Sequence, residues 1–158
     1  MKVREFIKQT KKLYFPTFSS KVAFLVGVLT RENEWAVRES EELNQFLNSL
    51  FTNTNTILTK TTFRKVIDVL IRLKRKTNDF QTTMLNYIIK AMLLIKDLDR
   101  HFLKIETGYF LSGYMLGLRE FYKFLKQIND KEREQDKFLS EQEKALKKFL
   151  SSKKNLLR

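Results

Sequence analysis

Apolar residues in this chain recur at three- and four-residue spacing in nearly every segment, and they do not alternate one by one. This spacing places the apolar side chains along one side of a helix, whereas a half-buried strand needs a period of two. Residues that interrupt helices are scarce, with four glycines and one proline among 158 residues. The sequence therefore predicts an all-α protein, a single bundle of about six to seven helices that ends in a basic C-terminal helix.

Capping residues and the same periodicity place the individual helices. Ser19 or Ser20 is expected to cap the second helix, Ser40 opens the third, and Ser140 with Glu143 forms a capping box for the last. The Thr- and Asn-rich run at residues 52–56 predicts a loop. The expected helices cover about residues 3–13, 20–34, 40–50, 62–76, 80–102, 107–128 and 140–157. We interpret residues 1–130 as the helical bundle and residues 131–158 as a basic amphipathic C-terminal helix or tail.

Charge is the feature that points most directly to a partner. Lysine and arginine total 31 against 18 acidic residues, so the formal net charge is +13. A field of one sign on a small domain attracts acidic polymers, nucleic acids first among them. The alternative is that a lysine- and asparagine-rich composition reflects an AT-rich genome, in which case the basic surface is incidental.

The segment at residues 60–76 carries the strongest binding signal. At 100° per residue its basic side chains fall within an arc of about 160°, opposite an apolar side that includes Phe63 and Leu70. Within the segment Asp68 is the acid that interrupts the cations, so the pairing typical of a solvated face is mostly missing. Such a row can follow a phosphate backbone without reading bases. The candidate contacts are Lys60, Arg64, Lys65, Arg72, Arg75 and Lys76; a merely solvated face is the alternative.

A second basic row supports the first. Lys96, Arg100 and Lys104 follow one another at four-residue spacing, although Asp97 and Asp99 lie between them and weaken the field. The lysines of the tail fit two interpretations equally well, because they could wrap a nucleic acid or keep the terminus soluble.

Aromatic residues are concentrated in the segment at residues 107–128. Because they recur at helical spacing, we interpret them as core packing in the main, with base stacking as the alternative. Ser112, Gly113 and Gly117 place small residues one turn apart, which suits the close approach of another helix. The expected partner is the second helix, through Gly27.

Motifs for catalysis and metal binding are missing from the sequence. There is no cysteine, and the single histidine, His101, has only Asp97 nearby as a second ligand. Glycine-rich phosphate loops, nucleophile elbows and HExxH motifs are also absent. We therefore expect no enzyme activity, no metal and no cofactor.

The sequence offers no segment that resembles a signal peptide or a membrane span. Its longest apolar stretch of interest, residues 22–29, is far shorter than the roughly twenty residues that a bilayer requires. We expect a cytoplasmic protein without a membrane partner. Peripheral membrane association through the tail helix stays open as an alternative.

Two short motifs resemble a known family. Residues 24–29, FLVGVL, resemble the FLLGVL-like helix that opens the C-terminal helical domain of the large subunit in type I-B CRISPR effector (Cascade) complexes. Residues 110–117, FLSGYMLG, look like the later F-x-x-G helix of that domain. The resemblance covers about residues 20–128. Some type I systems make this domain as a free small subunit, and a chain without a large N-terminal portion fits that form better.

The resemblance implies a helical bundle that stacks in copies along a guide-RNA complex and holds DNA strands through backbone contacts. The expected partners are single-stranded DNA or a guide-RNA/DNA hybrid, other subunits of the complex, and further copies of the chain, which the acidic patch at residues 39–42 could contact. The expected function is non-catalytic, sequence-independent nucleic-acid binding. The alternative is a helical protein-interaction module, an inhibitor or assembly factor, that docks an acidic partner.

Overall fold

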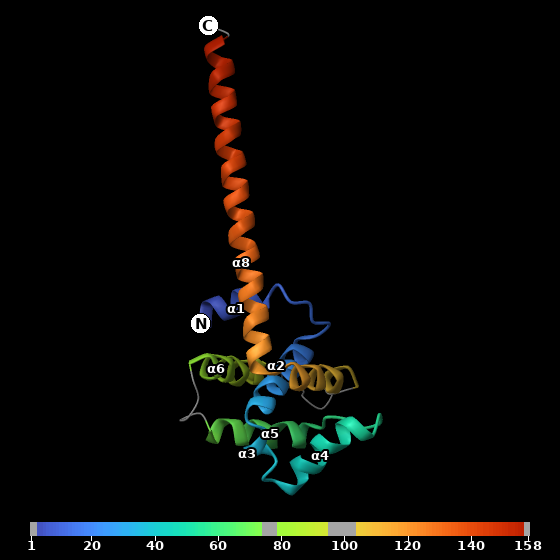
Figure 1. Cartoon of the computed structure of the whole chain (residues 1–158). Helices are drawn as coiled ribbons and strands as arrows, with labels where there is room; N and C mark the ends of the chain where they lie inside the picture. Colours follow the sequence, from blue (N-terminus) through green and yellow to red (C-terminus); the bar gives the residue numbers. More distant parts are fainter. Residues whose placement is uncertain (1–2, 74–78, 95–103, 157–158) are drawn as a thin grey trace. The chain divides into compact units, whose positions relative to one another are not determined.

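The computed structural model describes residues 3–73, 79–94 and 104–156, and each regular element within them is a helix (Figure 1). The all-α prediction is thereby confirmed. Contacts divide the chain into two units, Met1–Tyr122 and Lys123–Arg158, whereas the sequence placed this boundary after residue 130. The helices are α1 (Val3–Thr10), α2 (Phe18–Glu32), α3 (Glu34–Val37), α4 (Glu41–Thr52), α5 (Lys60–Arg72), α6 (Asp79–Leu94) and α8 (Lys104–Leu156).

Helix α2 is the central element of the first unit, where it contacts α3, α5 and α6. Its cap is Thr17, whose hydroxyl accepts a hydrogen bond from the Ser20 backbone N–H at 3.1 Å while the Ser20 hydroxyl accepts one from the Thr17 N–H at 3.2 Å. The predicted cap at Ser19 or Ser20 was therefore wrong. Thr17 follows Pro16 in extended backbone, so the helix begins earlier and both serines become buried inside its first turn.

Two glycines let α2 and α8 cross at backbone contact. A Cβ atom added to Gly27 would lie 2.1 Å from the Phe110 carbonyl oxygen, and one added to Gly113 would lie 2.1 Å from the Phe24 carbonyl oxygen. Since any side chain at either position would collide with the facing backbone, the two glycines fix the crossing point. The predicted approach of Gly113 to Gly27 is confirmed.

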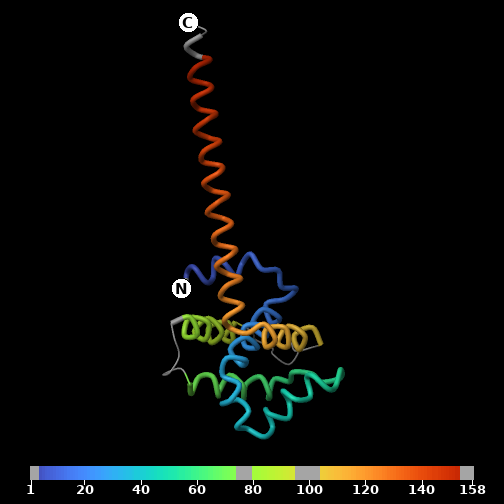
Figure 2. Tube along the Cα trace, in the orientation of Figure 1, coloured from blue at the N-terminus to red at the C-terminus, as the bar shows by residue number. Residues whose placement is uncertain are grey.

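Gly117 has a different role from the one its spacing suggested. It lies inside α8 with φ 79° and ψ 166°, a conformation that essentially only glycine adopts, and the chain changes direction within α8 (Figure 2). A Cβ atom there would meet only the Arg31 side chain, at 3.5 Å. Gly117 thus breaks the helix, and it faces a flexible side chain of α2 and not the α2 backbone.

After Gly117, α8 continues as helix to Leu156, through the region where a break was predicted. The capping box at Ser140 and Glu143 was wrong, because Ser140 lies in the helix interior. Residues 129–139 include no glycine or proline and consist mainly of charged residues that favour helix, so nothing stops the helix before Ser140. No helix of the described ranges has the length and apolar character needed to cross a bilayer.

The core of the first unit contains three aromatic residues of α8. Phe110, Tyr114 and Phe121 are buried, and the Phe121 ring meets those of Phe24 and Phe80 at centroid distances of 5.4 and 6.4 Å. Their interpretation as core packing is confirmed for these three side chains. The sequence did not predict the four-residue helix α3, which is too short to show a period.

Candidate nucleic-acid interface

Helix α5 separates an apolar side from a cationic side, as the sequence predicted. Thr59 caps it by accepting a hydrogen bond from the Thr62 backbone N–H at 3.2 Å, so the helix begins at Lys60, two residues before the expected start. Its buried residues are Phe63, Val66, Ile67 and Leu70. Because these side chains are buried, the opposite side of α5 lies at the surface of the bundle.

The predicted binding residues do not all fall on described elements. Arg64, Lys65 and Arg72 are exposed on α5, and Lys60 is half-buried at its start. Lys104 is exposed at the start of α8, so it belongs to a different helix from α6, which ends at Leu94. The remaining candidates, Arg75, Lys76, Lys96 and Arg100, lie outside the described residues.

One cation of the α5 row is paired with an acid from a neighbouring helix. The Lys65 ammonium contacts the Glu42 carboxylate of α4, with 45% and 56% of the two side chains exposed. Exposed pairs of this kind contribute little to stability, about 0–1 kcal/mol. Lys65 is nevertheless partly neutralised, and the sequence gave no sign of this because Glu42 lies 23 positions away. Arg64 and Arg72 form no ion pair with another described residue.

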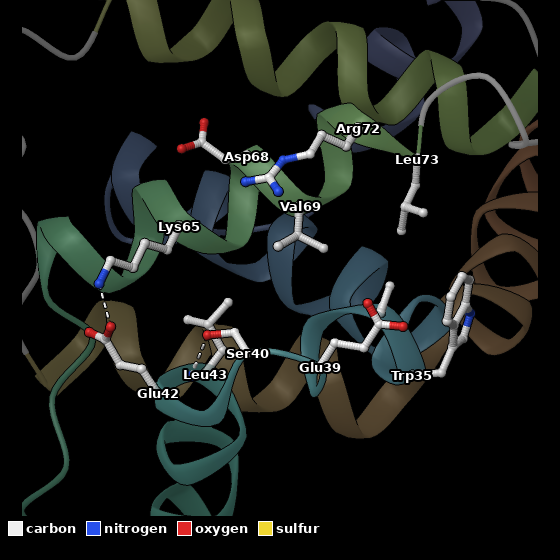
Figure 3. Close-up of a pocket in the computed structure, with 11 residues that line it drawn as sticks. Trp35, Glu39, Ser40, Glu42, Leu43, Lys65, Asp68, Val69, Arg72 and Leu73 are labelled. Carbon is white, nitrogen blue, oxygen red and sulfur yellow. Dashed lines mark hydrogen bonds and ion pairs between the residues drawn. The ribbon is translucent and has the colours of Figure 1, made fainter.

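A hollow of about 530 Å³ opens beside α5, between it and the segment that joins α3 to α4 (Figure 3). We call it the Trp35 hollow. The residues that line it include both acidic and basic side chains. Trp35, the single tryptophan of the chain, is exposed over 62% of its surface. The lining residues are Trp35, Ala36, Glu39, Ser40, Glu42, Leu43, Lys65, Asp68, Val69, Arg72 and Leu73. The surface along α5 is therefore basic at Arg64 and mixed at Arg72.

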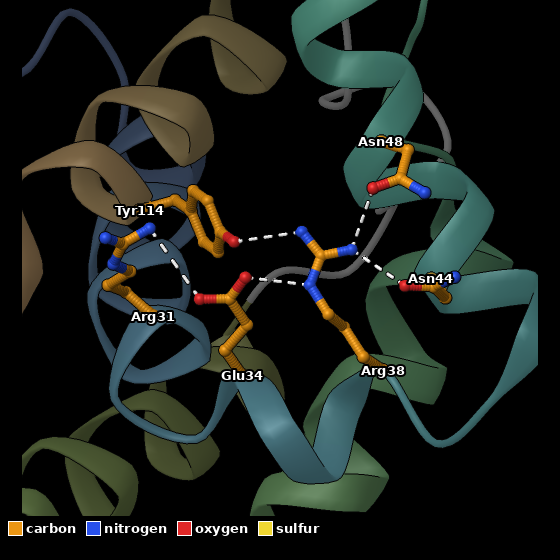
Figure 4. A network of polar contacts seen from close by, with 6 residues as sticks. All are labelled: Arg31, Glu34, Arg38, Asn44, Asn48 and Tyr114. Atoms are coloured by element: carbon orange, nitrogen blue, oxygen red, sulfur yellow. Dashed lines mark hydrogen bonds and ion pairs between the residues drawn. The ribbon is translucent and has the colours of Figure 1, made fainter.

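A polar network centred on Arg38 holds α3, α4 and α8 together (Figure 4). The guanidinium donates from Nε to Glu34 at 2.7 Å, from NH1 to Asn44 and Asn48 at 2.8 and 2.9 Å, and from NH2 to the Tyr114 hydroxyl at 3.3 Å. Glu34 also pairs with Arg31 at 3.6 Å. Because its donors are used within the bundle, Arg38 is a structural cation and does not extend the basic face.

This network makes stability depend on pH. The hydrogen bond from Tyr114 and the neighbouring Arg38 guanidinium lower the pKa of Glu34, against the opposing effect of burial. A carboxyl whose pKa is lowered on folding stabilises the protein above its ordinary pKa of about 4.3, and this stabilisation is lost as pH falls through the folded-state pKa. We expect Glu34→Gln to flatten the decline in urea midpoint between about pH 5 and pH 3. Urea unfolding followed by circular dichroism measures this, with Glu41→Gln as the control; equal slopes in both variants would contradict the assignment.

A second hollow, of about 300 Å³, lies where α1 leads into α2, and we call it the Lys21 hollow. Burial and the nearby charge of Lys11 lower the pKa of Lys21, whose ammonium also lies 5.1 Å from the centroid of the Tyr87 ring. Among the described residues that line it, none is acidic: Thr10, Lys11, Leu13, Phe15, Pro16, Thr17, Phe18 and Lys21. Two cations held close together suit an anion. This pair was not predicted from the sequence, because the turn at Pro16 that brings the two lysines together has no period to reveal it.

The sequence predicted no metal site and named His101 as the single histidine. His101 lies outside the described residues. Within the described part of the chain, no group of three or more His, Cys, Asp or Glu side chains is arranged to hold a metal ion.

No protein-family model, no curated protein and no solved structure matches the chain. The resemblance of residues 24–29 and 110–117 to the type I-B large subunit therefore stays a prediction from sequence.

Proposed function

We propose that this chain is a non-catalytic, sequence-independent nucleic-acid-binding protein that contacts the phosphate backbone. The observation that carries the proposal is the pair Arg64 and Arg72, exposed on the side of α5 opposite its buried residues. Eight positions separate them, which corresponds to about 12 Å along the helix axis. Two guanidinium groups on a rigid element can therefore contact phosphates of one strand at separate points.

Binding of this kind gains its free energy from released counterions. Each phosphate that an arginine neutralises sets free condensed cations, so the affinity falls steeply as salt rises. Long cationic side chains on a helix surface contact phosphate oxygens and carry no information about base identity. The bound nucleic acid is thus recognised by its charge and its path, and not by its sequence.

The Lys21 hollow offers a second place for a phosphate. Lys11 and Lys21 repel each other, so a phosphate group between them would relieve this repulsion while Phe15 and Phe18 provide apolar surface beside it. A strand with evenly spaced phosphates can use several such points, whereas a single small anion uses one. The hollow is therefore a second point at which a phosphate of such a strand could be held.

The resemblance to the type I-B large subunit suggests where this binding is used. We propose a small subunit of a CRISPR interference complex that holds single-stranded DNA or a guide-RNA/DNA hybrid beside other subunits and further copies of itself. Glu39 on the rim of the Trp35 hollow offers an acidic contact for a basic neighbour, whereas Glu42 is already paired with Lys65.

The test is a salt series with a labelled oligothymidine, followed by fluorescence anisotropy. Arg64→Glu with Arg72→Glu removes up to two phosphate contacts and adds repulsion. We expect affinity to fall at least about tenfold and the slope of log K against log salt to flatten by about two. Stability should change little, because both side chains are exposed.

The matched control is Lys131→Glu with Arg133→Glu, the same change of charge in a segment where acids and bases are interleaved. We expect this control to shift the curve slightly and to leave its slope nearly unchanged. If the α5 variant folds normally and keeps the parent's affinity and slope, α5 is a solvated surface and the proposal fails.

A second candidate function rests on Trp35. Exposed tryptophans are enriched at energetically important positions of protein interfaces, and this one borders a hollow that also contains Arg72. An acidic protein could pair with Arg72 while an apolar side chain covers the Trp35 ring. Titration with polyglutamate, followed by Trp35 fluorescence, separates the two candidates: tighter binding of polyglutamate than of oligothymidine at equal charge favours protein docking.

A further inference from the structure

Large apolar side chains lie on the exposed part of α8 in the second unit. From residue 133 to residue 153 each residue is exposed, and five large apolar side chains are 52–59% accessible. They are Phe138, Leu139, Leu146, Phe149 and Leu150. Apolar side chains without a role would be scattered singly around the helix. A group of large exposed ones on one helix indicates a binding surface.

These five side chains form one narrow face. At 100° per residue they occupy an arc of about 120°, while Lys137, Lys144, Lys147 and Lys148 occupy an arc of about 100° on the opposite side. Lys153 falls within the apolar arc, but its ammonium lies 5.5 Å from the centroid of the Phe149 ring, so its stem runs along the apolar face and its charge lies at the end. We call residues 137–153 the basic amphipathic segment.

Charge and geometry together select the occupant of this surface. The segment holds five lysines and two glutamates, of which Glu143 borders the apolar arc and Glu141 borders the cationic arc. An apolar stripe opposite a cationic face is typical of helices that lie in the plane of a membrane and bind anionic lipids. Such a helix needs no bilayer-spanning length, which agrees with the finding that no helix of the described ranges could cross one.

A second copy of the segment is a poorer occupant. A coiled-coil seam through Leu146 and Phe149 would place Gln142 and Lys153 at the adjoining seam positions, so two of these four seam positions would be polar. Nucleic acid is also a poorer occupant, because it would neutralise the lysines and leave the apolar face in water. Of these three occupants, an anionic lipid surface is the one that satisfies both faces at once.

We propose that the basic amphipathic segment binds the surface of membranes that contain anionic lipids. Phe138, Leu146, Phe149 and Leu150 enter the boundary between headgroups and acyl chains, and the lysines contact the lipid phosphates. This proposal is independent of nucleic-acid binding by the first unit, and it reverses the sequence-based expectation of no membrane partner.

The test is flotation of the full chain with vesicles of pure phosphatidylcholine and with vesicles that also contain phosphatidylglycerol. We expect binding to the second kind and much weaker binding to the first. Leu146→Gln with Phe149→Gln should weaken binding at least about tenfold through lost apolar area, and Lys144→Gln with Lys148→Gln by about tenfold on anionic vesicles. Glutamine favours helix, so circular dichroism should match the parent.

The matched control is Ser140→Gln with Ser151→Gln, two neutral changes on the cationic arc, which should leave flotation unchanged. Three results would overturn the proposal. The first is equal binding to both vesicles, and the second is binding that survives Leu146→Gln with Phe149→Gln, which would assign it to the bundle. The third is the absence of flotation by the parent chain. This result overturns the proposal whether Leu146→Gln with Phe149→Gln abolishes self-association in sedimentation, weakens oligonucleotide binding, or changes neither.

Discussion

Replacing Gly113 by alanine should lower the free energy of unfolding of the bundle by about 3 kcal/mol or more. The added Cβ atom would lie 2.1 Å from the Phe24 carbonyl oxygen and 3.1 Å from the Val28 backbone nitrogen. Backbone atoms cannot rotate away as a flexible side chain would, so α2 and α8 must move apart along their crossing. Separation of these helices loosens packing around buried neighbours, Leu25 and Phe110 among them. Thermal unfolding by circular dichroism should show a midpoint about 10 °C lower.

Gly108 is the matched control for this substitution. It lies in the same helix, and a Cβ atom there would meet nothing within 4 Å. Because alanine favours helix more than glycine does, Gly108→Ala should leave stability unchanged or raise it by up to about 1 kcal/mol. If Gly113→Ala and Gly108→Ala have equal midpoints, the close crossing of α2 and α8 is wrong.

Part of this packing could be predicted from the sequence. Local periodicity predicted the all-α fold and the buried side of α5, because burial follows the helix period. The approach of Gly113 to Gly27 was predictable for a similar reason, since small residues one turn apart permit backbone contact. The same reasoning failed at Gly117, because spacing alone does not distinguish a glycine that packs against a helix from one that ends it through a positive φ.

Two of the contacts that were missed depend on residues distant in sequence. Glu42 pairs with Lys65 across 23 positions, and Arg38 reaches Tyr114 across 76. Neither separation leaves a pattern in one sequence, so the basic row on α5 was expected to be more continuous than it is. The Lys21 hollow forms because the Pro16 turn brings Lys11 and Lys21 together, and a turn has no period to reveal it.

Phe121 and Phe124 together distinguish packing from base stacking among the aromatic residues of α8. Phe121→Ala should lower the free energy of unfolding by about 3–5 kcal/mol. The ring is fully buried, and it lies edge-on to Phe24 at 5.4 Å and near Phe80 at 6.4 Å, so truncation leaves a cavity that the helices cannot close. Urea unfolding at constant salt measures the change.

Phe124 gives the comparison, because it lies three residues later in the same helix and is 45% exposed. Phe124→Ala should cost less than about 1 kcal/mol, since an exposed ring contributes little to the core. Oligothymidine affinity should stay at the parent value in Phe124→Ala if nucleic acid is held through phosphates alone. A fall of tenfold or more in that affinity, with stability preserved, would mean that a base stacks on this ring. Phosphate contacts by Arg64 and Arg72 would then account for only part of the binding.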